Sequence, residues 1–305
     1  MSIGLILLRQ IIIMFLFMAV GFLLYKNKKI SLQGNRELGT LLLYIILPAS
    51  IIKSYLTEFT REKLMGLLLS LLMAALALAV SMLVSGIVFG SRHKVEHFSA
   101  AFSNAGFIGI PLVKAIVGEE GIFYLAAFVA MLNILQWTYG VVVMSGKREA
   151  ISKKKLITNP IVIALGIGLV FFFLPLQVPG ILSESLTMTA NMTAPVAMII
   201  LGVYLGQMEG KELFQGKEVL LCSLLRLVVI PLLTFGVLSL FSGEYLAIKL
   251  AVLTAAAAPV GSNVAIFAQL NGLGYTEAVK NVTVSTIFSI VTMPVILSIA
   301  AMCWK

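Results

Sequence analysis

Ten long apolar runs take up most of this 305-residue chain, and they restrict its folding more than any other feature. A helix needs about 20 apolar residues, at about 1.5 Å each, to cross the hydrocarbon core of a bilayer. Charged residues make up only 11% of the chain, whereas a soluble domain has about 25% to form a polar shell. The sequence therefore predicts an all-α polytopic membrane protein with ten transmembrane helices, at residues 3–25, 38–56, 64–89, 95–117, 121–144, 159–179, 186–207, 218–241, 246–270 and 277–302.

The basic residues lie mainly in the connections between these runs, and their distribution predicts the orientation of the chain. Alternate connections, counted from the first, hold fourteen lysines and arginines, whereas the opposite side has seven. Because the richer side normally faces the cytoplasm, both termini are expected outside a plasma or inner membrane. The basic connection 147–158 separates five runs (1–146) from five more (159–305). An odd number of crossings in each half predicts two inverted five-helix repeats.

Two classes of function are disfavoured by the residues themselves. The net charge of +9 does not indicate a nucleic-acid partner, because the basic residues are spread over short connections. His93-Lys94-Val95-Glu96-His97 fits the H-x-x-E-H pattern of some zinc proteases. That chemistry needs a stable helix and a third ligand, whereas this motif straddles a short cytoplasmic connection, is expected to be solvated, and holds both histidines of the chain. We therefore expect no enzyme, no metal ion and no organic cofactor.

Two of the apolar runs contain residues that interrupt a helix, one in each half of the chain. The fourth run includes SNAGFIGIP at residues 103–111, and the ninth includes APVGSN at residues 258–263. Proline lacks a backbone N–H, and lipid cannot satisfy the polar groups that a broken helix releases. Such breaks are tolerated where they are buried in protein or line a wet cavity. They therefore predict a substrate site near the middle of the membrane.

The residue types at these breaks suit an anion. A half-helix N-terminus presents unpaired N–H groups and roughly half a positive charge, so two such ends facing one point form an anion site. Asparagines and serines add neutral donors, and glycines let the backbone approach a ligand or, equally, a partner helix. Two amides on one face of the fifth run would line the pocket, bind a coupling ion or pair two helices. The candidate substrate-binding residues are Ser103, Asn104, Gly106, Gly109, Pro111, Asn133, Gln136, Pro259, Gly261, Ser262 and Asn263.

Arg226 is the one arginine expected well inside a crossing, about eight residues into the eighth run. A charge at that depth is costly unless its long side chain reaches the surface or a polar interior. Three roles are open for it: capping backbone carbonyls, reaching the cytoplasmic surface, or pairing with a substrate anion. A structural role is favoured. No Asp or Glu lies deep in any run, which weakens the case for a built-in proton or sodium antiport mechanism.

At these positions the chain resembles the auxin efflux carrier family, the bacterial relatives of plant PIN carriers. The matching pieces are residues 103–111, residues 133–140, Thr158-Asn159-Pro160, Arg226 with Pro231, and Ala258-Pro259. The resemblance implies a ten-helix fold like that of sodium/proton antiporters and bile-acid symporters, in which broken helices four and nine cross. It also implies a scaffold of helices 1, 2, 6 and 7, a mobile transport domain of helices 3–5 and 8–10, and a homodimer. Bacterial relatives are associated with malate, malonate and similar small organic anions.

The resulting prediction is a secondary active transporter of small organic anions, either mono- or dicarboxylates, that works by an elevator motion. Two alternatives stay open. One is a sodium-coupled symporter of larger amphipathic anions on the same fold, and the other is a membrane sensor that uses the fold to bind a ligand. The expected partners are the anion, the lipid bilayer and a second copy of the chain. A coupling ion, H⁺ or Na⁺, is left open.

Overall fold

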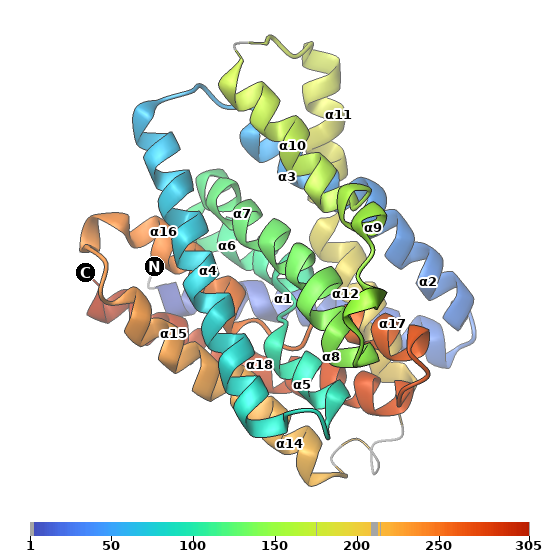
Figure 1. Cartoon of the computed structure of the whole chain (residues 1–305). Coiled ribbons are helices and arrows are strands. Elements are labelled where there is room, and N and C mark those ends of the chain that lie inside the picture. Colours follow the sequence, from blue (N-terminus) through green and yellow to red (C-terminus); the bar gives the residue numbers. More distant parts are fainter. Residues whose placement is uncertain (1–2, 175, 209–212, 214, 305) are drawn as a thin grey trace.

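The computed structural model describes residues 3–174, 176–208, 213 and 215–304, and this part of the chain folds into a bundle of helices (Figure 1). The first half contains α1 (Ile3–Lys26), α2 (Leu32–Leu41), η1 (Leu42–Ile46), α3 (Leu47–Tyr55), α4 (Arg61–Phe89), α5 (Lys94–Ala101), η2 (Ala105–Gly109), α6 (Ile110–Val117), α7 (Glu119–Leu135), η3 (Gln136–Gly140), α8 (Val141–Ser145), η4 (Arg148–Ala150) and α9 (Lys153–Ile157). The second half contains α10 (Pro160–Phe173), α11 (Gly180–Asn191), α12 (Thr193–Gly206), α14 (Lys217–Leu224), η5 (Leu225–Val229), α15 (Ile230–Leu238), η6 (Gly243–Tyr245), α16 (Leu246–Ala257), α17 (Asn263–Leu270) and α18 (Tyr275–Cys303).

Helix length and composition support a polytopic membrane protein. In the described part of the chain, seven helices are long and apolar enough to cross a membrane: Gly4–Lys26, Leu32–Tyr55, Arg61–Phe89, Glu119–Ser145, Gly180–Gly206, Lys217–Leu238 and Tyr275–Cys303. The fourth and ninth predicted runs are each split into two shorter helices. The sixth is shorter than predicted, because α10 ends at Phe173 and Leu174 precedes a proline, which disfavours helical backbone. The count of ten crossings stays a prediction.

Four of the helical segments contain one wide, π-helical turn, and in three of them a proline is the second residue after the turn. Pro48 follows η1, Pro111 follows η2 and Pro231 follows η5, each at the second position of the next α-helix. A proline cannot donate to the carbonyl four residues earlier, and its ring crowds that carbonyl. A wide turn accommodates the missing bond without ending the helix, and such turns are frequent at functional sites.

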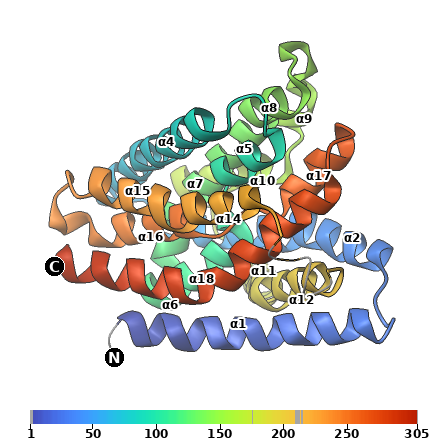
Figure 2. The same ribbon diagram turned by 90° about the horizontal axis from the view of Figure 1, so that it is seen from below.

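The helices pack into two sets of neighbours. In one set α1 lies along α12, and α3 lies against α10 and α11 (Figures 1 and 2). The α1–α12 contact brings the two backbones together, since a Cβ on Gly202 would collide with Met18 and one on Gly21 with Ile199. In the other set α4–α7 and α14–α18 pack on one another. The sets meet where α1 contacts α6 and α18, and where α7 contacts α3 and α10.

The prediction that the motif at residues 93–97 is a solvated connection is wrong for its last three residues, Val95, Glu96 and His97. Glu96 and His97 lie on α5 and are buried, because α5 packs against α4, α14 and α18. The His97 ring holds two hydrogen bonds of 2.8 Å, from Nδ1 to Gly90 O and between Nε2 and the Tyr139 hydroxyl. Among the described residues, no three His, Cys, Asp or Glu side chains are placed to hold a metal ion.

Candidate functional site

The two interrupted segments meet at their breaks. The Asn104 N–H donates to Pro259 O at 2.7 Å, and the Gly261 N–H donates to Phe102 O at 3.0 Å. Between these bonds, Ser103 and Val260 form an isolated antiparallel β-bridge. Gly261 permits this approach, because a Cβ there would lie 3.0 Å from Ser103 O. The broken backbones therefore satisfy each other, and the two breaks form one linked unit.

Two helices begin directly after the breaks, and their first turns lack side-chain caps. Asn104 is the N-cap residue of η2, which continues into α6, and Ser262 is the N-cap residue of α17. Neither side chain makes a capping hydrogen bond. Ser103 Oγ and Asn104 Nδ2 are also buried, with residue exposures of 3% and 5%, and neither has a hydrogen-bond partner. Buried polar groups are normally paired, so unpaired donors at helix N-termini favour an anionic ligand.

A small cavity of about 30 Å³ lies at the crossing, and most of the predicted site residues line it. Gly109 instead faces α16, and a Cβ on it would lie 3.8 Å from Ala255 Cα, in ordinary van der Waals contact; Pro259 contributes its carbonyl to the crossing. Pro111 lies in a different cavity, of about 270 Å³, on the far side of the crossing. The predicted residues that the crossing cavity brings together are Ser103, Asn104, Gly106, Asn133, Gln136, Gly261, Ser262 and Asn263.

The two amides of the fifth segment have different partners. Asn263 Nδ2 donates to Gln136 Oε1 at 3.0 Å, which joins α17 to the first residue of η3. Asn133 Nδ2 donates to Val129 O at 2.8 Å, one turn earlier on its own helix. Of the roles open at the sequence level, pairing of two helices is therefore observed for Gln136.

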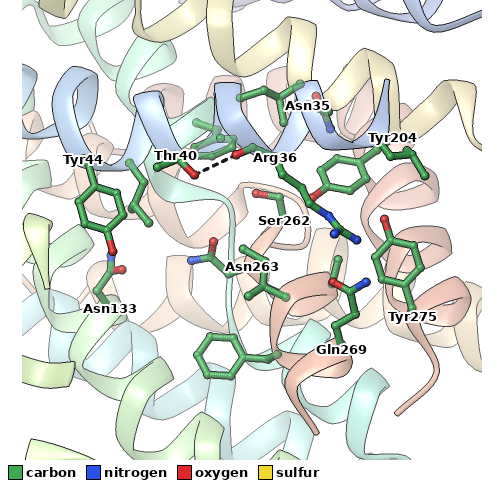
Figure 3. A pocket seen from close by; sticks show the side chains of 18 of the residues that line it. Asn35, Arg36, Thr40, Tyr44, Asn133, Tyr204, Ser262, Asn263, Gln269 and Tyr275 are labelled. Atoms are coloured by element: carbon green, nitrogen blue, oxygen red, sulfur yellow. Dashed lines mark hydrogen bonds between the residues drawn. The ribbon is translucent and has the colours of Figure 1, made fainter. Parts of the chain in front are cut away.

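A larger cavity of about 400 Å³ adjoins the crossing, and its lining includes residues from the beginning of α2 (Figure 3). It shares Leu43, Phe107, Asn133, Ser262 and Asn263 with the crossing cavity, so the two spaces adjoin. Its described lining contains no Asp or Glu. Sequence reasoning missed its outer polar residues, which carry no motif and come from separate segments: Asn35, Arg36, Thr40, Tyr44, Tyr204, Gln207, Gln269 and Tyr275.

Arg226 binds the C-terminal ends of α5 and α16, the two helices that precede the breaks. Its side chain is 1% exposed, and its guanidinium donates to Ala100 O at 2.9 Å and to Ala256 O. These carbonyls belong to the last turns of α5 and α16, where the helix dipole is negative. A planar fork of donors suits two carbonyls at once. Of the three roles considered for Arg226, the carbonyl-capping role is the one that these hydrogen bonds support.

We expect Arg226→Gln to lower the melting temperature of the purified protein. The change leaves two buried carbonyls without their partner, and each unpaired group costs about 1–3 kcal/mol. Thermal unfolding in detergent measures the melting temperature, and Arg92→Gln, a substitution at an exposed arginine, is the matched control. An unchanged melting temperature together with lost transport would instead make Arg226 a substrate counter-ion.

The comparison with protein families agrees with this geometry. The family described as membrane transport protein matches residues 6–297, which include both breaks, Arg226 and nearly every helix of the bundle. No match is found among curated proteins. The match covers almost the whole chain, and the several long apolar helices are those of a multi-pass membrane protein. The chain therefore belongs to the membrane transport protein family, the family of the auxin efflux carriers.

Proposed function

We propose that this transporter is a secondary active carrier of small organic anions, mono- or dicarboxylates, which bind at the crossing of the two broken helices. The unpaired Asn104 Nδ2 and Ser103 Oγ, buried beside the start of η2, are the observation that carries this proposal. A carboxylate accepts several hydrogen bonds at once, and bonds to an ionised acceptor are stronger than neutral ones. No acidic side chain in the described cavity lining would repel it.

An elevator motion would carry this site across the membrane. The scaffold would be α1, α2–α3, α10 and α11–α12, which pack on one another, and the transport domain would be the rest of the bundle. The larger cavity lies between the two sets, with Arg36 and Tyr204 on one side and Phe107 and Asn263 on the other. On the far side of the crossing, Lys114 Nζ donates to Asn191 Oδ1 at 3.2 Å and joins α6 to α11. This bond joins the proposed transport domain to the proposed scaffold beside the cavity of about 270 Å³, and an elevator motion would break it.

The membrane arrangement belongs to the same proposal: ten crossings in two inverted five-helix repeats, with both termini outside. Both termini lie at one end of the molecule, and α1 runs from there to its connection with α2 at the opposite end (Figure 2). The large cavity would then open to the cytoplasm, beside the basic connection 147–158. Labelling of single cysteines at residues 153–155 by an impermeant reagent from outside the cell would contradict this orientation.

Counterflow in proteoliposomes tests the proposed function directly. Vesicles loaded with one carboxylate should take up the same radiolabelled carboxylate against its gradient, and a series of mono- and dicarboxylates identifies the preferred anion. Repeating the assay with and without Na⁺ and at several pH values identifies a coupling ion. Binding of an anion without any exchange would favour the sensor alternative. Sodium-dependent stabilisation by larger amphipathic anions, seen as a higher melting temperature, would favour the symporter.

A homodimer through the scaffold belongs to the same proposal. It would hold the scaffold still while the transport domain moves.

A further inference from the structure

One charged side chain, Arg36 of α2, stands in the described lining of the large cavity. Figure 3 shows its side chain extending from α2 into the cavity toward Tyr204, Tyr275 and Gln269, away from the crossing residues Ser262 and Asn263. The two tyrosines come from the end of α12 and the start of α18. Segments far apart in the sequence therefore place aromatic hydroxyls around one cation at the cavity mouth.

The charge of Arg36 has no acidic partner in the described part of the chain. The ion pair found there is Lys114–Glu119, which lies by the cavity on the other side of the crossing. The neighbouring carboxylate, Glu37, accepts instead from Gln33 Nε2 at 3.1 Å. No side chain among the described residues occupies the five N–H donors of the Arg36 guanidinium.

The two tyrosines differ in their hydrogen bonds. The Tyr275 hydroxyl donates to Gln207 Oε1 at 3.0 Å, which fixes its ring at the side of the cavity. The Tyr204 hydroxyl has no hydrogen-bond partner among the described residues and lies on a half-buried side chain. It can donate to a group that Arg36 holds. This combination, a guanidinium fork plus a free hydroxyl, matches the acceptor geometry of a carboxylate.

We infer that Arg36 and Tyr204, with the Tyr275 ring fixed beside them, form a second anion-binding site at the cavity mouth, which captures a carboxylate before it passes to the crossing. The choice of carboxylate as ligand rests on the proposed function. Arg36 is exposed, so its attraction is partly screened and the anion is held weakly enough to leave. From there the path runs past Thr40 and Ser262 to Asn263, neutral groups that accept and donate hydrogen bonds without trapping a charge.

Anion access to the mouth can be measured without any transported substrate. Trp137 lines the same cavity, so its fluorescence reports on quenchers that enter there. In a Trp304→Phe background, we expect Arg36→Gln to lower quenching by iodide about twofold or more, because local anion concentration follows local charge. Quenching by neutral acrylamide should not change. Arg92 is an exposed arginine outside the cavity lining, so iodide should quench the Arg92→Gln protein as strongly as the parent. Lys155, whose Nζ lies 5.0 Å from the Trp137 ring centre, is present in all these proteins. Equal iodide quenching in Arg36→Gln and the parent would overturn the inference.

Transport kinetics separate capture from movement. Arg36→Gln should raise KM for the carboxylate about tenfold, the lower end for loss of a charge-assisted bond, and leave kcat unchanged. Arg36→Lys should recover part of this loss, since it keeps the charge without the planar fork. A fall in kcat at constant KM would place Arg36 in the moving machinery and overturn the capture role. If no carboxylate is transported while iodide quenching depends on Arg36, the proposed function fails and the mouth site stands.

Discussion

Asn104→Ala is expected to weaken binding of the transported carboxylate about 10- to 150-fold while the protein stays folded. Asn104 Nδ2 is buried at the crossing and has no protein partner, so its removal breaks no hydrogen bond of the fold from that atom. The backbone bond from the Asn104 N–H to Pro259 O remains. A hydrogen bond to a charged group contributes about 1.5–3 kcal/mol, which converts to the stated range. Titration calorimetry measures affinity, and thermal unfolding checks the fold.

Asn281→Ala supplies a matched control for this experiment. Asn281 on α18 is fully buried, and its amide nitrogen and oxygen also lack partners, but it lines neither the crossing cavity nor the large one. Its replacement should therefore leave affinity unchanged. Asn263→Ala should lower both affinity and melting temperature, because it also breaks the bond to Gln136. Unchanged affinity of Asn104→Ala for every transported anion would assign Asn104 to structure alone.

A disulfide between α1 and α18 is expected to stop transport, and reduction should restore it. A Cβ built on Gly4 lies 3.6 Å from Ser298 Cβ, within the range of about 3.5–4.5 Å that a disulfide needs. In a Cys303→Ser background, Gly4→Cys with Ser298→Cys joins the proposed scaffold to the proposed transport domain, far from the crossing. If these parts slide past each other, the crosslink holds them in one position. Counterflow before and after reduction measures the effect.

The control crosslink lies inside the proposed scaffold. The hydroxyls of Ser50 on α3 and Thr193 on α12 are 3.0 Å apart, so Ser50→Cys with Thr193→Cys should bridge without moving the backbone. Counterflow should continue after this bridge forms, because both helices belong to the part that stays still. The opposite result, with transport spared by the α1–α18 bridge and stopped by the α3–α12 bridge, would exclude an elevator and favour local gating.

Local chemistry made the breaks predictable. Whether a helix continues depends on hydrogen bonds between residues four apart, and proline or glycine changes those bonds wherever the rest of the chain lies. The interruptions at residues 103–111 and 258–263 follow from that rule, as do six of the eight candidate residues that line the crossing; the other two, Asn133 and Gln136, were predicted from their spacing on one helix face. For Arg226 the sequence favoured a structural role and left carbonyl capping as one of three possibilities, and the hydrogen bonds of the folded chain support that one.

Only the tertiary structure decided which side chains of different helices lie next to each other. These contacts depend on how each helix is rotated and packed in the bundle. The bond between Gln136 and Asn263 joins residues 127 positions apart, and no spacing rule relates them. Burial of Glu96 and His97 depends on the helices that cover α5, so a charged stretch beside a loop was misread as solvated. For the same reason, Arg36, Tyr204 and Tyr275 form a cavity mouth in the folded chain, whereas their positions in the sequence predict only the ends of three separate helices.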